Sequence, residues 1–524
     1  MTSIVQTGSL SGVQAYGVRV EVSPIRGLPG FDIVGMPEAG IRESRVRVLA
    51  ALRNSGFELP EQRFVVNLAP ADVRKSGSSF DLAIAIALLA QCELCAPNKL
   101  AETLIVGELS LDGVLRPVRG LLAHLQSARE RGLLRALIPQ AAASSAALVA
   151  GLEIHCADDL LGAVEFLGGE RELPGPVQER WEPAITSRTG CDLQDVRGQH
   201  AAKRALEVAA AGGHDLLMIG PPGSGKSMLA QRLPGLLPPP NSEEALQIAT
   251  IAGAGGLLSR PSVPGRAERP FRAPHHSCSD VALVGGGDPI RPGEVTLAHG
   301  GVLFLDELPE FRRSALEALR PTMEAGVASI VRARERACMP AKPLIVAAMN
   351  PCPCGYAAHP RRVCRCGPEQ IRRYHARVSG PLMDRFDLHV ALPPVSAGEI
   401  ERGETGEASG QVRARVQAAR QYARLRIDAG RVPARAQPRS TLVQMSAELE
   451  PKALSLLHRC MRELELSLRA YAKVLKIART IADLAHSERV TTAHVAEAVQ
   501  YRLLDRDPQR ALSAPGDARG LARS

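Results

Sequence analysis

One stretch of the chain combines glycines, a lysine and a serine at the spacing of a nucleotide-binding loop. It comprises Gly220, Pro221, Pro222, Gly223, Ser224, Gly225, Lys226 and Ser227. Residues 215–219 before it are typical of a buried strand, and 228–230 open a helix. The glycines let backbone N–H groups turn toward phosphates, and the helix N-terminus adds partial positive charge. Lys226 is expected to reach the β- and γ-phosphates and Ser227 to ligate Mg²⁺, so the loop predicts ATP or GTP binding.

Two carboxylates follow a second apolar segment, about eighty residues after the loop. Residues 301–305 are typical of a buried strand and lead into Asp306 and Glu307. At the carboxyl edge of a sheet, Asp306 is expected to coordinate Mg²⁺ and Glu307 to activate the attacking water. Apolar strands that end in acids are common, so this pattern gains its weight from the phosphate loop.

An amide and an arginine follow at two further strand boundaries. Residues 343–349 predict a third strand that ends in Asn350. This amide either orients the attacking water or contacts the γ-phosphate, or it is a simple turn residue. Arg385 stands between a helix-like segment and a predicted strand at 388–390. It either pairs locally with a neighbouring aspartate or acts as an arginine finger on the nucleotide of a neighbouring subunit in a ring.

Four cysteines form two C-x-C pairs with nine residues between them: Cys352, Cys354, Cys364 and Cys366. Four thiolates at such spacing would close a tetrahedral Zn²⁺ site, and this site would be structural because no position is left for water. C-x-C is tighter than the usual C-x₂-C. Four reduced cysteines in a loop are therefore the alternative.

Composition bounds the class of protein and its partners. The 524 residues suggest two to four domains, and a formal net charge of +9 favours a polyanionic partner. Aromatic residues make up only 3%, so contacts to nucleic acid should go mainly to phosphates. The start of the chain shows no signal sequence, and the longest apolar run, 82–90, is short enough to be a core helix. We therefore expect a soluble, cytoplasmic protein without a disulfide framework.

The pattern of apolar segments predicts several consecutive units. The first, 1–170, alternates predicted strands at 17–22, 64–68, 103–106 and 136–138 with predicted helices at 40–55, 79–91 and 121–132. After it we expect a linker at 171–190, an ATPase core at 191–395, a connector at 396–440, a helical domain at 441–505 and a tail at 506–524.

The connector and the helical domain each carry notable arginines. Residues 411–440 hold eight arginines against one acid, Asp428. This bias indicates either a solvated helix face or a contact with phosphates or another subunit. The helical domain is predicted to contain helices at 451–465, 468–485 and 492–503, and Arg469 opens the second of them.

The first unit resembles the proteolytic domain of Lon, with its ribosomal S5-like α/β fold. The resemblance rests on 75–81 (KSGSSFD), 107–109 (GEL) and 117–121 (PVRGL). Ser79 falls at the place of the nucleophilic serine, although a serine ahead of a helix is also an ordinary N-cap. Where the family has the partner lysine, this chain has Leu122. A serine without that base stays a weak nucleophile, so we expect a Lon-like fold without peptidase activity.

The order of these features along the chain resembles that of an AAA+ ATPase with a helical lid. The features are the phosphate loop, Asp306-Glu307, Asn350, Arg385 and Arg469. Segments 269–277 (RPFRAPHHS), 348–355 (AMNPCPCG) and 379–387 (SGPLMDRFD) are similar to the magnesium-chelatase-like ComM/YifB proteins. The resemblance covers essentially the whole chain. It implies a parallel-sheet α/β core and a hexameric, ATP-driven DNA motor of the helicase or branch-migration type, which acts on incoming DNA during natural transformation.

The same resemblance assigns further roles. Arg469 takes the second sensor position, and 325–342 match a pore-facing hairpin of related replicative helicases. If 330–336 is a strand, its alternating arginines make one face basic, so Arg332, Arg334 and Arg336 are either DNA contacts or part of a solvated edge. Three other functions remain as alternatives: a chelatase-type remodeller that works with partner subunits, an ATP-dependent protease, and a nucleotide-gated scaffold. Leu122 disfavours the protease, and the Asp306-Glu307 pair disfavours the scaffold.

Overall fold

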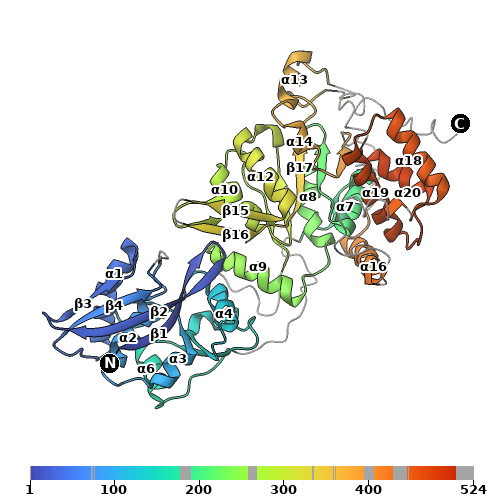
Figure 1. Cartoon of the computed structure of the whole chain (residues 1–524). Coiled ribbons are helices and arrows are strands. Elements are labelled where there is room, and N and C mark those ends of the chain that lie inside the picture. Colours follow the sequence, from blue (N-terminus) through green and yellow to red (C-terminus); the bar gives the residue numbers. More distant parts are fainter. Residues whose placement is uncertain are drawn as a thin grey trace.

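The structure is a computed structural model that describes most of the chain. It covers residues 2–71, 75, 77–176, 190–257, 268–332, 335–357, 359, 362–394, 406–428, 445–446 and 448–502. An N-terminal α/β part, a central α/β part and a C-terminal group of helices follow one another along the chain (Figure 1). Arg334, most of the expected linker, both ends of the expected connector and the expected tail lie outside the described residues.

The N-terminal part is built on a mixed seven-stranded sheet of order β3-β4-β2-β1-β5-β8-β9. Its strands are β1 (Ser3–Ser11), β2 (Gln14–Ile25), β3 (Gly30–Val34), β4 (Arg63–Ala69), β5 (Thr103–Ile105), β8 (Arg135–Pro139) and β9 (Glu153–Ala157). β1, β2 and β4 pair antiparallel, whereas the other neighbours pair parallel. The four predicted strands are confirmed. β1, β3 and β9 were not predicted; β1 is rich in Ser, Thr and Gln, so its sequence lacks a strong apolar alternation.

Helices cover this sheet. The main ones are α1 (Ala39–Asn54), α2 (Asp81–Ala90), α4 (Leu121–Glu130) and α6 (Leu160–Gly168). Shorter elements are α3 (Pro97–Glu102), β6 (Glu108–Leu109), β7 (Leu115–Arg116), η1 (Gln140–Ala142) and α5 (Ala143–Ala146). The apolar run 82–90 lies within α2, which is buried along nearly its whole length, so its prediction as a core helix is confirmed.

The central part contains a five-stranded parallel sheet of order β11-β14-β17-β10-β18. The strands are β10 (Leu216–Ile219), β11 (Phe271–Arg272), β14 (Val302–Leu305), β17 (Leu344–Met349) and β18 (Leu388–Ala391). β10, β14 and β17 are buried at every position, as their uninterrupted apolar sequences predict. Because all five strands run in one direction, the loops that follow them gather at a single edge.

Helices surround the central sheet. They are η2 (Leu193–Asp195), α7 (His200–Gly212), α8 (Lys226–Arg232), η3 (Leu233–Leu236), α9 (Ser242–Ala254), α10 (Asp280–Val284), α11 (Glu294–Leu297), η4 (Leu308–Glu310), α12 (Arg313–Ala325), α13 (Pro368–His375) and α14 (Gly380–Met383). Two small ribbons complete this part: β12 (Gly285–Gly286) with β13 (Arg291–Pro292), and β15 (Val327–Val331) with β16 (Arg336–Pro340).

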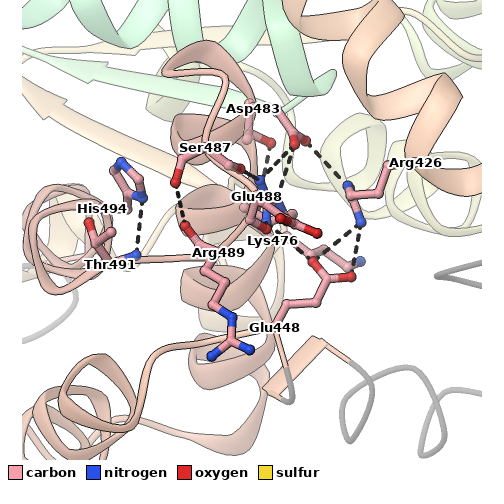
Figure 2. Close-up of polar contacts among 11 residues, drawn as sticks. Arg426, Glu448, Lys476, Asp483, Ser487, Glu488, Arg489, Thr491 and His494 are labelled. Atoms are coloured by element: carbon pink, nitrogen blue, oxygen red, sulfur yellow. Dashed lines mark hydrogen bonds and ion pairs between the residues drawn. The ribbon is translucent and has the colours of Figure 1, made fainter.

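The C-terminal helices are α16 (Ser409–Asp428), α18 (Pro451–Glu463), α19 (Leu468–Leu484) and α20 (Thr492–Gln500). They share an apolar core with α7, in which Leu206, Val416 and Val474 are fully buried. A charged cluster also joins α16 to α19: Arg426 contacts Glu448 at 3.0 Å and Asp483 at 3.4 Å (Figure 2). None of the helices in the described part of the chain is long and apolar enough to cross a membrane.

The arginines of α16 are mostly turned toward the protein. Arg413 donates to the carbonyl of Gly235 at 3.2 Å, Arg420 donates to the carbonyl of Ala210 at 2.6 Å, and Arg415 pairs with Glu207 at 2.6 Å. Together with Arg426, these side chains hold α16 against α7, η3 and α19. Arg424 is exposed, and Arg431, Arg435 and Arg439 lie outside the described residues, so the external contact that the sequence left open stays a prediction.

Candidate nucleotide-binding site

The loop between β10 and α8 forms an open cradle. Gly223 and Gly225 have φ of +77° and +91°, in the left-handed region that favours glycine. A Cβ at either position would meet nothing within 4 Å, so the space beside the loop is open. The buried hydroxyl of Ser224 has no hydrogen-bond partner among the described residues. An open, N–H-lined turn at a helix N-terminus fits a phosphate group.

Lys226 lies over this loop. Its Nζ donates to the carbonyls of Gly220 at 2.7 Å and Pro221 at 3.0 Å, and to Oδ1 of Asn350 at 3.1 Å. Burial lowers the pKa of Lys226, and the negative charges of Asp306 and Glu307 oppose that effect. The structure thus places the lysine of the phosphate loop and the amide at the end of β17 in direct contact.

Ser227 and Asp306 form the second contact between predicted site residues. Ser227 Oγ donates to Asp306 Oδ2 at 2.7 Å, which joins the start of α8 to the end of β14. A hydroxyl and a carboxylate oxygen at this separation fit two adjacent positions in the coordination shell of Mg²⁺. The residues present therefore fit the metal that a bound nucleotide would bring.

Glu307 has a contact that the sequence did not predict. Its backbone is left-handed, with φ of +53°, and its half-exposed side chain lies 3.2 Å from Nδ1 of His276. His276 follows β11, and the parallel pairing Arg272↔Leu303 places the residues after β11 beside those after β14. In the sequence, 269–277 marked only a family resemblance, because the contact of His276 with Glu307 arises from the pairing of β11 with β14.

Two aromatic rings fix the backbone after β17. Burial raises the pKa of Tyr374 to about 12, and the backbone of Asn350 opposes this effect. His375 Nε2 lies 3.0 Å from the carbonyl of Pro351. Both rings belong to α13, so this helix lies beside the backbone that follows β17.

The four predicted cysteines converge in the loop between β17 and α13. The Sγ of Cys352 lies 3.3 Å from that of Cys354 and 3.6 Å from that of Cys364, and all four sulfurs lie within 4.8 Å of one another. A zinc ion with bonds of 2.3 Å sets tetrahedral ligands about 3.8 Å apart. The cluster, which also includes Cys366, is therefore consistent with a zinc site.

This cysteine loop also contacts the phosphate loop. Gly355 has φ of +82°, and a Cβ there would lie 2.5 Å from Cδ of Pro222. Only glycine allows the two loops to approach this closely without displacement.

The two arginines that the sequence singled out, Arg385 and Arg469, lie away from the phosphate loop of their own chain. Arg385 precedes β18, whose carboxyl end pairs with the residues before the phosphate loop, so Arg385 is at the opposite edge of the sheet. There it pairs with Glu324 of α12. Arg469 is exposed in the first turn of α19. One turn later on this helix, Lys473 donates to the carbonyl of Phe386 at 3.0 Å, so Arg469 is near the edge that carries Arg385.

The basic hairpin has a different geometry from the predicted strand. Residues 330–336 include the end of β15 and the start of β16, with Val331 paired to Arg336. The segment is therefore not a single strand, so the condition under which its arginines would share one face is not met, whereas 327–340 do form a hairpin within the 325–342 that the resemblance singled out. The side chains of Arg332 and Arg336 are exposed.

In the N-terminal part, Leu122 stands where the resemblance to Lon places the partner lysine. Ser79 is nearly buried, and Leu122 is packed inside α4 at 1% exposure. Lys75, the nearest lysine in sequence, is also buried and donates to the carbonyl of Pro70. Near Ser79, Asp81 pairs with Arg47 at 2.9 Å.

Three family profiles match the chain in succession. "Subunit ChlI of Mg-chelatase" matches residues 20–142, "Magnesium chelatase, subunit ChlI" matches 192–400, and "Magnesium chelatase, subunit ChlI C-terminal" matches 406–502. The uncharacterized protein YifB of Escherichia coli is 44% identical over 506 residues, which cover 96% of this chain and 97% of YifB. The competence protein ComM of Haemophilus influenzae is 42% identical over 507 residues, which cover 96% of this chain and 98% of ComM.

Proposed function

Because this chain belongs to the magnesium-chelatase ChlI-like family of AAA+ ATPases, with YifB and ComM as full-length homologues, we propose that it is a ring-forming, ATP-driven DNA motor. Membership of this family implies ATP hydrolysis with Mg²⁺. The observation that carries the proposal is the division of the site between two edges of one sheet: the phosphate loop lies at one edge and Arg385 at the other.

At the first edge, each residue has a distinct role. Lys226 binds the phosphates, Ser227 and Asp306 hold Mg²⁺, and Glu307 takes a proton from the attacking water. Asn350, whose Oδ1 lies 3.1 Å from Lys226 Nζ and so beside the phosphate site, contacts the γ-phosphate or orients that water. Bound Mg²⁺ supplies the charge that stabilises the phosphoryl group in the transition state.

The second edge serves a neighbouring subunit. An arginine that lies across the sheet from its own phosphate loop reaches a nucleotide only if another subunit presents one. Arg385 is therefore the arginine finger of the ring, and Arg469, which lies near the same edge, acts across the same interface. A closed ring, most often of six subunits in the related motors, repeats this contact between each pair of neighbours.

DNA is the proposed substrate. The homologue ComM is named a competence protein, and this chain carries a net charge of +9. Arg332, directly after β15, is exposed, and the resemblance to replicative helicases assigns Arg332 and Arg334 to a DNA-contacting hairpin. We assign the protein to the cytoplasm, where it extends the pairing of incoming single-stranded DNA with the chromosome during natural transformation.

The four cysteines hold a structural zinc ion. Cys352, Cys354, Cys364 and Cys366 supply four sulfurs, which leaves no position for a reacting water. We also propose that 1–170 is a Lon-like domain without peptidase activity, since a buried leucine stands in place of the catalytic lysine.

A second candidate function is favoured by the names of the matched families. All three profiles describe a magnesium-chelatase subunit, including the one that matches the N-terminal part. A remodeller of this type would hydrolyse ATP in response to a partner subunit rather than to DNA.

One experiment separates the two functions. The ATPase rate of the full chain is measured alone, with single-stranded DNA and with forked DNA, alongside the oligomer mass with ATP. The DNA motor predicts assembly with ATP and a higher rate with DNA. A chain that stays monomeric at saturating nucleotide, or whose rate ignores every DNA, contradicts it.

A further inference from the structure

The β1–β2 hairpin extends beyond the sheet of the N-terminal part. Its two strands stay paired from Ser3↔Val22 to Ser11↔Gln14. The neighbouring strand β4 pairs with β2 only as far as Arg19. The remainder of β1 and β2 is thus a two-stranded arm, which Figure 1 shows reaching toward α9 and β16. We call Ser11–Val13 at its end the arm tip.

The arm tip is embedded in the apolar core of the central part. Val13 is 5% exposed and belongs to the same core cluster as Leu303, Ile345 and Met339. Gly12 has φ of +59°, and a Cβ there would lie 3.0 Å from the sulfur of Met339 and 3.2 Å from Cβ of Ala337. The backbone of one domain therefore packs directly on the inner face of β16.

A polar contact continues this interface toward the hairpin turn. Ser11 Oγ donates to the carboxylate of Glu335. Glu335 is itself a turn residue, since its carbonyl accepts from the backbone N–H of Arg332 at 2.8 Å. The arm tip thus touches both β16 and the turn that carries Arg332.

The N-terminal part contacts the central part at a second place. The N-terminus of α4 meets the C-terminal end of α9, where the N–H of Gly120 donates to the carbonyl of Gly253 at 3.1 Å. Leu246 of α9 packs on the cluster that contains Leu121 and Leu125. The helix α9 follows α8 and η3 in the chain, and α8 begins within the phosphate loop. The contact between α4 and α9 therefore joins the N-terminal part to the segment that follows the phosphate loop.

From these contacts, we propose that the N-terminal domain is an internal brace: its arm tip holds the β15–β16 hairpin at the position where the hairpin meets the nucleic-acid strand. This role rests on the proposed DNA motor and gives the domain a task that needs no peptidase chemistry. A hairpin that is held rigidly transmits force to a strand, whereas a hairpin without this support would move without load.

The test introduces asparagine into the full-length chain at two glycines of the same domain. Gly12→Asn places a side chain against Met339 and Ala337. Gly132→Asn is the matched control, because Gly132 has φ of +77° and a Cβ there would meet nothing within 4 Å. Asparagine tolerates this backbone region, so both variants carry a similar backbone cost. Val13→Ala is a second variant that weakens the same contact without adding bulk.

Two readouts separate the brace from the DNA motor. Hydrogen exchange of residues 335–340 reports the brace without DNA, and we expect faster exchange in Gly12→Asn and Val13→Ala but not in Gly132→Asn. We also expect Gly12→Asn to lower the DNA-stimulated ATPase rate by about fivefold or more, a usual size for a coupling between sites, while the basal rate stays within about twofold. Wild-type exchange and wild-type DNA stimulation in both tip variants overturn the brace. A wild-type chain that ignores DNA overturns the motor, and hydrogen exchange then still decides whether the arm tip holds the hairpin.

Discussion

Arg385 and Glu324 form an ion pair within one chain, at the edge of the central sheet that is opposite the phosphate loop. This pair holds the proposed arginine finger at the surface where a neighbouring subunit would bind. We expect Arg385→Ala to lower ATP turnover by at least about 10³-fold, the lower end of the range for arginine fingers, while nucleotide affinity in a binding assay stays close to wild type.

Glu324→Ala is the control for this prediction. If Arg385 served only to stabilise α12 through its ion pair, removal of either partner would have the same effect. We expect Glu324→Ala to retain most of its turnover, because the free arginine can still reach the neighbouring nucleotide. Equal losses in the two variants would argue that the ion pair is structural.

Glu307 and His276 define a second prediction. Glu307→Gln should bind ATP but lose about 10²- to 10⁴-fold in kcat, the contribution usual for a general base. His276 lies 3.2 Å from the Glu307 carboxylate, so His276→Ala should lower kcat and leave KM nearly unchanged. His276→Asn should recover part of the loss, because its amide can still donate a hydrogen bond. A change in KM alone would instead mean that His276 binds nucleotide.

The cysteine cluster leads to a prediction about metal. Purified protein should contain about one equivalent of zinc, because four thiolates close one tetrahedral site. Cys364→Ser should lose the metal and bind ATP more weakly, since the same loop packs Gly355 against Pro222 of the phosphate loop. Cys338→Ser, at an exposed cysteine on β16, is the matched control and should change neither property. Less than a few tenths of an equivalent of zinc in the wild type would exclude the site.

Asp215 makes the stability of the core depend on pH. Burial, with a smaller effect from nearby Asp387, raises the pKa of Asp215 to about 8. An unfolded aspartate has a pKa of about 3.9, so between these values only the folded state keeps the proton. The stabilising contribution of Asp215 to the free energy of unfolding is therefore fully present below about pH 4, and it is lost progressively as the pH rises to about 8.

Asp215→Asn should remove this dependence. The amide oxygen can still accept from the N–H of Ile345, the contact that Asp215 makes at 2.8 Å. We expect the variant to be more stable than wild type at pH 8 by at least about 1 kcal/mol, with the difference shrinking toward pH 5. Thermal unfolding across this range provides the measurement. A constant difference between the two proteins at every pH would contradict the buried, protonated state.

The sequence predicted the parts of the site that depend on local patterns. The phosphate loop, the acids after β14 and Asn350 each follow an apolar strand, and parallel strands bring such residues to one edge. The contacts that it missed join segments distant in sequence. His276 meets Glu307 only through the pairing of β11 with β14, and the arm tip meets Met339 across two domains.

The bias of the arginines in α16 was also visible in the sequence, but its meaning was not. A count of charges does not reveal that Arg420 donates to a carbonyl of α7 or that Arg415 pairs with Glu207. Such partners become known only when the packing of the helices is known. The arginines of 330–336 are a similar case. The antiparallel pairing of Val331 with Arg336, which divides this segment between two strands, becomes known only from the structure.

The central claim is that ATP hydrolysis moves this protein along DNA. Its most direct test is the release of a fluorescent strand from a forked duplex by the full-length chain, with Mg²⁺ and ATP. The account predicts release that requires hydrolysable ATP and disappears in Glu307→Gln. Normal ATP hydrolysis without strand release, on forked and three-stranded substrates alike, would contradict it.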